Sequence, residues 1–297
     1  MAQKPFILPK DIPIAEYPGP EVFLSEGKRL VEEGEKRGIV MRVMGPLALH
    51  YYFPDQIDLY ARLERLGERY FTDIDYAAYG KGRGKMRDFM KEMGYECDQE
   101  TMVMSGKTRK HLIKFMESLG YECDLQTMMA SGKTRHIYYA GKVPMIDVFF
   151  DKLDYCHEVD YAGRLEKDPW SVPLSDILLQ KLQIVEINDK DLKDIEYLFV
   201  TCEIGDDDAH KINQNYIAQR FADDWGFWYT ATQLNLPKVK EHCVQVPALT
   251  PEMCERIKAQ ADKLLARVEA EPKSKKWSKR AKKGASKVWY NEGFSDW

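Results

Sequence analysis

The stretch Thr72–Ala77, which reads TDIDYA, decides the fold class because it combines a strand pattern with two carboxylates. Residues two apart in a β-strand point to the same face, so Asp73 and Asp75 should converge. Two convergent carboxylates repel each other unless a proton or a cation lies between them, and Mg²⁺ prefers oxygen ligands. A D-x-D pair is common by itself, so its meaning depends on the segments around it.

A later apolar run carries a third carboxylate. The run Val143–Phe150 predicts a strand, and Asp147 lies between Ile146 and Val148 within it. If this strand lies beside the first, three carboxylates meet at one point, which suits two-metal phosphoryl or nucleotidyl transfer. The alternative is an aspartate at the edge or the end of a strand, the usual place for an isolated acid.

The segments around these strands alternate between helix and strand. Residues 21–36 have the apolar spacing of a helix, residues 39–44 form a β-branched run, and Gly45 is followed by a proline that suits a first helical turn. Residues 85–93 predict an amphipathic helix, and residues 136–139 predict another strand. The first half of the chain therefore predicts a sheet with helices around it.

The second half predicts helices only. One helix begins near Ser175, a candidate N-cap, and ends near Ile187. A second begins at Asn188, and a third runs from Thr250 to Glu271. The predicted fold class is α+β, with a mixed sheet flanked by helices and followed by a helical C-terminal region.

A tandem repeat interrupts the first half. Residues 84–109 align without gaps on residues 110–135, and 14 of 26 positions are identical. Two copies are fewer than the roughly three that a solenoid needs, so we interpret the repeat as a local duplication of one helix-plus-strand unit. The expected parts are an extended, proline-rich arm over 1–20, an α/β core over 21–157, a helical region over 158–271 and a basic tail over 272–297.

Composition limits the classes of protein. The chain has 297 residues, of which 44% are hydrophobic and 31% charged, which is typical of a globular protein. It contains no apolar run of about 18 residues that could cross a membrane and no secretory signal core. Six cysteines without a C-x-x-C pair favour free thiols in a reducing, cytoplasmic compartment.

Charge is distributed unevenly along the chain. The net charge is −4, but residues 271–297 carry +5, which leaves −9 on the rest. The body is therefore not a general nucleic-acid-binding surface. We expect the tail to be a solvated, poorly ordered end, with RNA binding or nucleotide steering as the alternative.

The strand and turn segments together resemble the nucleotidyltransferase superfamily with the DNA polymerase β-type fold. The resemblance is carried by Val43–Leu49, Arg69–Asp75 and Ile146–Phe149, and it covers roughly residues 21–200. Within the superfamily the sequence looks most like the minimal and abortive-infection-type enzymes, some of which act as toxins in toxin–antitoxin pairs. The implied fold is a nucleotidyltransferase-like mixed sheet.

The resemblance also implies roles for individual residues. The turn at Gly45 would cradle a triphosphate, Asp73 and Asp75 would bind Mg²⁺ (two ions in all), and Asp147 would bind metal or help to activate the attacking hydroxyl. Arg69 is a weaker candidate for a phosphate contact, since a solvated surface arginine is the commoner case.

Lys181 is a further candidate for nucleotide binding. Leu178–Gln183 and Lys190–Asp194 resemble the lysine-bearing helix and the K-D-x-x-D segment that follow the family core. The neighbours of Lys181 three and four positions away are apolar, so its ammonium lies on a buried stripe and needs an anionic partner such as a phosphate. The alternative is a lysine snorkelling at the helix edge. Asp194 is a candidate partner for a basic group.

Two features depart from the family pattern. Gly45 is followed by Pro46, which has no N–H, so one phosphate-binding donor is lost. Asp75 and Asp147 are 72 positions apart, whereas removal of one repeat copy would leave 46. Either feature can impair the site.

The remaining motifs are weaker evidence for a functional site. Residues 105–108 and 131–134 resemble the end of a Walker A loop, but each lacks the glycine required five positions earlier. Arg109 or Arg135 can still reach a substrate phosphate. Cys156 and the adjacent histidine lack further ligands at zinc spacing, so core packing is the simpler interpretation. The aromatic residues over 221–229 favour helix packing over base stacking.

The sequence thus predicts a Mg²⁺-dependent nucleotidyltransferase that moves an NMP from an NTP to a hydroxyl of a tRNA end, a protein or a small molecule. The resemblance implies a cognate antitoxin as a further partner, and no membrane is implied. The alternative is a catalytically impaired relative that binds a nucleotide or a protein. An RNA-binding accessory protein is a third hypothesis, and it rests on the tail.

Overall fold

The computed structural model describes residues 7–67, 69–97 and 134–292. Most of the tandem repeat and both Walker-like segments, apart from Thr134, lie outside these residues. The chain forms two compact units, each made of segments that are far apart in sequence. Unit 1 comprises Met1–Leu47, Arg69–Asp154 and Asp160–Ser171, and unit 2 comprises Ala48–Glu68, Tyr155–Val159 and Val172–Trp297.

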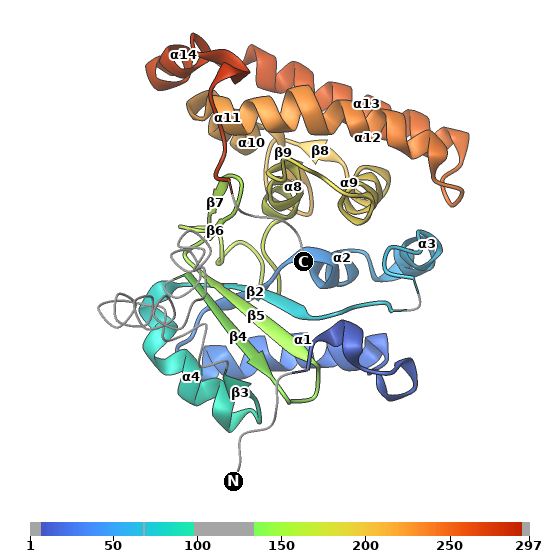
Figure 1. The fold of residues 1–297 in the computed structure, drawn as a ribbon, viewed down its shortest axis with the longest axis vertical. Helices are drawn as coiled ribbons and strands as arrows, with labels where there is room; N and C mark the ends of the chain where they lie inside the picture. Colours follow the sequence, from blue (N-terminus) through green and yellow to red (C-terminus); the bar gives the residue numbers. More distant parts are fainter. Residues whose placement is uncertain (1–6, 68, 98–133, 293–297) are drawn as a thin grey trace, which may run out of the picture. The chain divides into compact units, whose positions relative to one another are not determined.

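Unit 1 is built on a five-stranded sheet with the strand order β1-β2-β5-β4-β3 (Figure 1). Its strands are β1 (Met41–Val43), β2 (Ile74–Ala78), β3 (Glu96–Cys97), β4 (Arg135–Tyr139) and β5 (Met145–Phe150). The central pair β2–β5 is parallel, and the other pairs are antiparallel. The sheet is therefore mixed, as the sequence predicts, and the predicted strands are present with small shifts at their ends.

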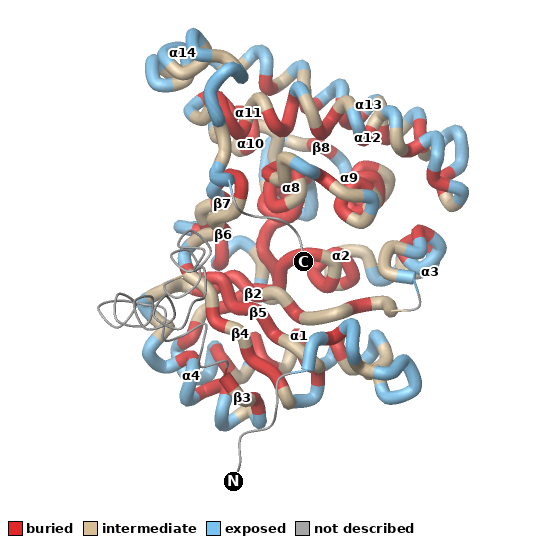
Figure 2. Tube along the Cα trace, in the orientation of Figure 1, coloured by how far each residue is buried: buried red, intermediate tan, exposed pale blue. Residues whose placement is uncertain are grey.

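Two helices cover one face of this sheet, α1 (Pro20–Lys36) and α4 (Arg83–Glu92) (Figure 1). The hydroxyl of Tyr76 on β2 donates to the backbone oxygen of Gly27 in α1 at 3.1 Å. Figure 2 shows the central strands β2 and β5 buried over most of their length. Because side chains alternate along a strand, the neighbours of Tyr76 in β2 point to the other face, away from α1.

Shorter elements complete unit 1. The arm forms 3₁₀ turns at Pro9–Asp11 and Ile14–Glu16, and β6 (Lys152–Asp154) follows β5. α2 (Gly45–Tyr52) begins at the glycine turn in unit 1 and belongs to unit 2 from Ala48 onward. β7 (Glu158–Asp160) lies where the chain passes between units.

Unit 2 is almost entirely helical. Its helices are α3 (Ile57–Arg62), α8 (Leu174–Leu182), α9 (Asp189–Thr201), α10 (Gln214–Asp223), α11 (Trp225–Trp228), a π-helical turn at Tyr229–Asn235, α12 (Leu236–His242), α13 (Pro251–Ala270) and α14 (Lys275–Ala281). α13 packs against α9, α10 and α12. The short strands β8 (Ile204–Gly205) and β9 (Ile212–Asn213) form a parallel pair that the sequence did not predict. The aromatic segment 221–229 is helical and contributes to the core, as predicted.

Two of the three helix starts that the sequence predicts for unit 2 are confirmed. Asn188 and Thr250 cap α9 and α13 through their side chains. The predicted N-cap at Ser175 is wrong, because α8 begins after Pro173 and ends at Leu182 rather than near residue 187. The Ser175 hydroxyl instead accepts from the backbone N–H of Asn213 at 2.7 Å, which ties α8 to β9.

The expectation of a poorly ordered basic tail is also wrong for residues 272–292, the part of the tail that the structure describes. Trp277 packs edge-on against Trp228 with ring centroids 5.1 Å apart, and Trp289 packs against Tyr229 at 5.0 Å. The indole of Trp289 also donates to the Thr230 hydroxyl at 3.0 Å. Charge alone predicts a solvated end, whereas the aromatic residues of the tail provide its contacts with the rest of unit 2. No helix among the described residues has both the length and the apolar character to cross a bilayer.

Candidate metal and nucleotide site

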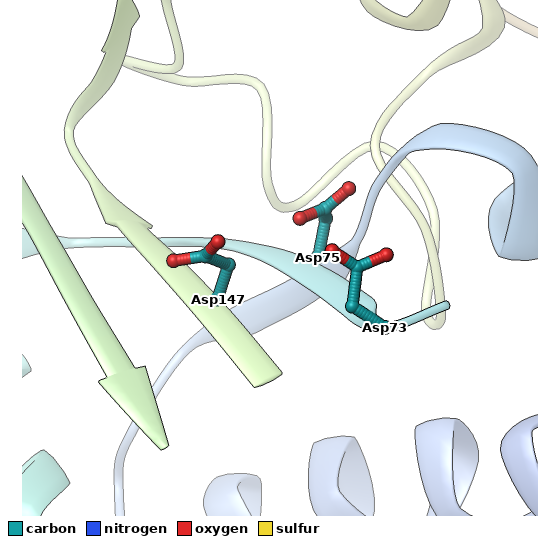
Figure 3. A group of neighbouring side chains, drawn as sticks. All are labelled: Asp73, Asp75 and Asp147. Atoms are coloured by element: carbon teal, nitrogen blue, oxygen red, sulfur yellow. The ribbon is translucent and has the colours of Figure 1, made fainter. Parts of the chain in front are cut away.

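Three carboxylates meet on the sheet face opposite α1 and α4. The parallel register of β2 and β5 sets Asp75 directly beside Asp147, and Asp73 precedes Asp75 by two residues on the same side. Figure 3 shows the three side chains projecting together from the sheet. One carboxylate oxygen from each of them lies within 4.8 Å of the others. The sequence predicted these residues, and the strand pairing on which their meeting depends is present.

Asp147 has a cationic partner that the sequence argument did not assign to it. The Arg135 guanidinium on β4 donates from Nε to Asp147 Oδ1 at 2.7 Å and from Nη2 to Oδ2 at 2.5 Å. Asp147 is 2% exposed, so this bidentate pair compensates a charge that has lost its water. The guanidinium also lies over the ring of Phe149, 5.4 Å from its centroid.

Three carboxylates lie together here, and Arg135 pairs with one of them, Asp147. Aspartate oxygens are hard ligands of the kind that Mg²⁺ and Mn²⁺ accept, and Mg²⁺ usually keeps several waters beside one or two carboxylates. No other group of three His, Cys, Asp or Glu side chains within the described part of the chain brings ligand atoms this close. The residues therefore fit a divalent cation.

Gly45 lies beside one of the carboxylates. Its φ of +61° is a conformation that glycine adopts readily, and a Cβ added to it would lie 3.5 Å from Asp75 Oδ2. The backbone N–H of Met44 donates to the backbone oxygen of Asp75 at 2.8 Å, which fixes the turn against β2. The turn and the D-x-D pair are thus neighbours in unit 1, as the sequence predicts.

Arg69 contacts the arm rather than the carboxylates. Its Nη2 donates to the backbone oxygens of Ile12 at 2.8 Å and Lys10 at 3.1 Å, and its guanidinium lies over the Tyr17 ring. Tyr17 in turn donates to the backbone oxygen of Thr72 at 3.0 Å. Burial and the nearby Asp73 charge raise the pKa of Tyr17 to about 12. Arg69 therefore fastens the arm next to the start of β2.

Lys181 belongs to unit 2, where its ammonium is paired with carboxylates. Nζ lies 2.6 Å from Asp191 Oδ1 and 2.9 Å from Asp194 Oδ2, and Arg65 Nε lies 2.8 Å from Asp194 Oδ1. Burial acts to lower the pKa of Lys181, but the two aspartates outweigh it and raise that pKa. The chain itself supplies the anionic partner that a buried lysine needs, and Asp194 is a partner of basic groups as the sequence indicated.

Cys156 and His157 are core residues. The ring of His157 contacts the Thr230 hydroxyl at 2.8 Å and stacks on Phe227 with centroids 5.1 Å apart. Burial lowers the pKa of His157 to about 4, so the ring is neutral at physiological pH. This agrees with the packing interpretation of the pair.

Comparison with known proteins adds little to this geometry. No protein-family model and no curated protein matches the chain. Among solved structures the chain is similar to the antibiotic-resistance factor ANT(2'')-Ia, whose solution structure reveals substrate-regulated conformation dynamics. The two share 14% identity with a TM-score of 0.26, and the alignment covers 84% of this chain and 95% of the other. A score this low does not establish a common fold, so only the site geometry bears on function.

Proposed function

We propose that the chain is a Mg²⁺-dependent nucleotidyltransferase that moves an NMP from an NTP to a hydroxyl. The observation that carries the proposal is the register of β2 and β5, which sets Asp75 beside Asp147 with Asp73 on the same side. Two strands far apart in sequence thereby build one cluster of hard oxygen ligands on one face of the sheet. Phosphoryl-type transfer needs such a cluster because its catalysis is mainly positioning and charge neutralisation.

In this proposal the three aspartates have different roles. Asp73 and Asp75 would hold the divalent cations, which neutralise phosphate charge when bound. Asp147 would share in metal binding or take the proton of the attacking hydroxyl. The hydroxyl oxygen forms a bond to the α-phosphorus, the bond from that phosphorus to the pyrophosphate oxygen breaks, and the hydroxyl proton passes to a carboxylate.

Gly45 and Arg135 are the residues that we assign to the triphosphate. Gly45 places no side chain next to Asp75 Oδ2. The Arg135 guanidinium has the fork geometry that matches a phosphate, and a bound cation would replace it as the charge partner of Asp147. Arg69 and Lys181 would need to leave the carbonyl and carboxylate partners they contact now. A direct phosphate role for those two residues is therefore the weaker part of the proposal.

The alternative is a catalytically impaired protein that binds a nucleotide or a partner protein. Pro46, the second residue of α2, motivates it because proline offers no N–H to a phosphate. The expectation of a cognate antitoxin rests on the sequence resemblance alone. The acceptor hydroxyl stays open among a tRNA end, a protein and a small molecule.

Calorimetric titration of ATP, GTP, CTP and UTP with Mg²⁺ tests the proposal. Wild type should bind one nucleotide, and Asp73→Asn/Asp75→Asn should lose at least about tenfold in affinity because metal ligands are removed. The matched control Asp58→Asn/Asp223→Asn removes the same charge from exposed positions and should bind like wild type. Nucleotide-dependent pyrophosphate release then separates the enzyme from an impaired binder.

Three results would contradict the proposal. They are no binding of any nucleotide by wild type, binding that does not need a divalent cation, and equal affinity in the wild-type and Asp73→Asn/Asp75→Asn proteins.

A further inference from the structure

The folded C-terminal segment carries a dense group of exposed lysines. Residues 272–292 hold eight basic residues and one acidic residue. Six of the lysines are exposed, and we call them the lysine surface: Lys275, Lys276, Lys279, Lys282, Lys283 and Lys287. The surface spans α14 and the turn that follows it.

The backbone under the lysine surface is fixed by its own contacts. Trp277 and Trp289 pack against aromatic residues of unit 2, as described above. The Arg280 guanidinium lies over the Trp225 ring, 4.6 Å from its centroid, and donates to the backbone oxygens of Gly284 at 2.8 Å and Lys287 at 2.9 Å. Arg280 therefore holds the turn after α14 together, and the lysines lie on a segment that packs against unit 2 through its two tryptophans.

Within the described residues, no carboxylate forms an ion pair with the lysine surface. None of its six ammonium groups lies within ion-pair distance of a carboxylate of the described chain, whereas Lys240 in the same unit pairs with Asp262 at 2.6 Å. Gathering like charges raises the free energy of the folded state through repulsion. A chain with a net charge of −4 keeps this concentrated positive region on a folded segment. Such a region fits a polyanion.

Aromatic side chains lie among these charges. Trp228, Trp277, Trp289 and Tyr290 are each only half-buried. A cationic track next to accessible aromatic rings is the combination that holds single-stranded nucleic acid, because lysines meet the phosphates and rings stack on bases.

We propose that the lysine surface binds single-stranded nucleic acid. Binding is an additional property of unit 2 and does not depend on the three aspartates of unit 1. RNA and single-stranded DNA present the same phosphates and bases to such a surface, and the two are separated by the test below.

The test is fluorescence anisotropy of the full chain with labelled oligonucleotides of about 16 nucleotides. Lys276→Glu/Lys279→Glu/Lys283→Glu should weaken binding of single-stranded RNA at least about tenfold. The slope of log affinity against log salt should also fall by about two, since each lost phosphate contact contributes about 0.7. The same sequence as single-stranded DNA tests whether the protein recognises the sugar. If the glutamate variant loses the same factor in affinity for RNA and for DNA, the surface contacts only phosphates and bases.

Matched variants keep the test sharp. Lys91→Glu/Lys211→Glu/Lys238→Glu makes the same charge change at exposed lysines elsewhere and should bind like wild type. Lys276→Arg/Lys279→Arg/Lys283→Arg preserves the charge and should also bind, which covers the case in which the glutamate variant fails to fold. Asp73→Asn/Asp75→Asn should retain RNA binding, so failure of the proposed transferase and failure of this proposal are distinguishable.

Four outcomes would overturn the proposal: no salt-dependent binding by wild type, loss of binding in the arginine variant, equal weakening in the matched glutamate control, and binding of poly-glutamate or anionic vesicles in preference to RNA. The last outcome would assign the surface to another class of partner.

Discussion

At the residue scale, the pair of Arg135 and Asp147 shows what the candidate site needs. A carboxylate that is 2% exposed requires a positive partner, and here both of its oxygens are occupied by one guanidinium. A divalent cation would supply the same charge to the same group. Arg135 and a cation are therefore alternative or joint partners of Asp147. Removing Arg135 then tests whether a cation binds at Asp147.

Arg135→Gln should lower stability by about 2 to 3 kcal/mol, because it leaves a buried carboxylate without its charge partner. Millimolar Mg²⁺ or Mn²⁺ should restore part of this loss, so the metal-induced rise in Tm should be larger in the variant than in wild type. Thermal unfolding with and without metal measures both effects. Arg37→Gln, which breaks an exposed ion pair, should show neither, and an equal metal response in wild type and Arg135→Gln would refute the argument.

Glu196 provides a pH-dependent test in unit 2. The side chain is fully buried, with Oε1 2.7 Å from His242 Nδ1, and burial raises its pKa to about 7 from an ordinary value of 4.5. The folded protein keeps this proton up to about pH 7, whereas the unfolded chain loses it near pH 4.5. The folded state therefore binds more protons between these values, and the contribution of Glu196 to stability falls as the pH rises.

Glu196→Gln should remove this dependence. Chemical unfolding from pH 4.5 to pH 7.5 should show the free energy of wild type falling by about 2 to 3 kcal/mol relative to the variant. Glu186→Gln changes an exposed glutamate and should follow wild type at each pH. Parallel pH profiles for wild type and Glu196→Gln would show that the buried carboxyl does not titrate in this range.

At the element scale, the register of β2 and β5 is what assembles the candidate site. Because side chains alternate, a shift of one residue would turn Asp147 toward α1 and α4 and leave Asp75 beside an apolar residue. The sequence predicts both strands and all three carboxylates, since apolar alternation and D-x-D spacing are local patterns. The pairing of strands 72 positions apart is a long-range property that one sequence leaves conditional.

The wrong or incomplete predictions concern residues whose hydrogen-bond or ion-pair partners lie in distant segments of the chain. Ser175 has the side chain of a typical N-cap, but its hydroxyl accepts a hydrogen bond from β9 instead. The prediction that Lys181 lies on a buried stripe is confirmed. Its carboxylate partners lie on the next helix, and only the K-D-x-x-D spacing of that helix points to them in the sequence. The sequence around Arg135 indicates only a candidate phosphate contact, and its pairing with Asp147 follows from the antiparallel register of β4 and β5.

The turn before α2 offers a matched pair of glycine variants. Gly45→Ala and Gly38→Ala both place alanine at a positive φ, which costs about 1 to 2 kcal/mol of stability. Only at Gly45 would the methyl approach a carboxylate, 3.5 Å from Asp75 Oδ2, whereas nothing lies within 4 Å at Gly38. Calorimetry should therefore show weaker Mg²⁺-nucleotide binding for Gly45→Ala alone. Equal nucleotide affinities in the two variants would place the triphosphate away from this turn.

At the scale of the whole molecule, the chain divides into an α/β unit and a helical unit, and the C-terminal segment is part of the second. The sequence predicts the two architectures because their periodicities differ. It does not predict that residues 48–68 join the helical unit, since that membership depends on tertiary packing. The order of the tail is missed for a related reason. Net charge is counted directly from a sequence, whereas the ring contacts of Trp277 and Trp289 depend on residues of other helices.

The tail gives a stability prediction for unit 2. Trp289→Ala removes the contact with Tyr229 and the hydrogen bond to Thr230, and should cost about 2 to 4 kcal/mol. Its neighbour Val288 is 57% exposed, so Val288→Ala should change stability by less than about 0.5 kcal/mol. Scanning calorimetry measures both variants. A melting profile unchanged by Trp289→Ala would show that the tail does not stabilise unit 2 and is a solvated end.

The claim that Asp73, Asp75 and Asp147 form a divalent-cation site is tested most directly by titrating Mn²⁺ and measuring the free ion by electron paramagnetic resonance. Wild type should show saturable binding that tightens with nucleotide, and Asp75→Asn should lose it at least about tenfold. The exposed control Asp58→Asn/Asp223→Asn should bind like wild type. Equal Mn²⁺ binding by wild type and Asp75→Asn would contradict the account, because the central ligand of the proposed cluster would then play no part in holding a cation.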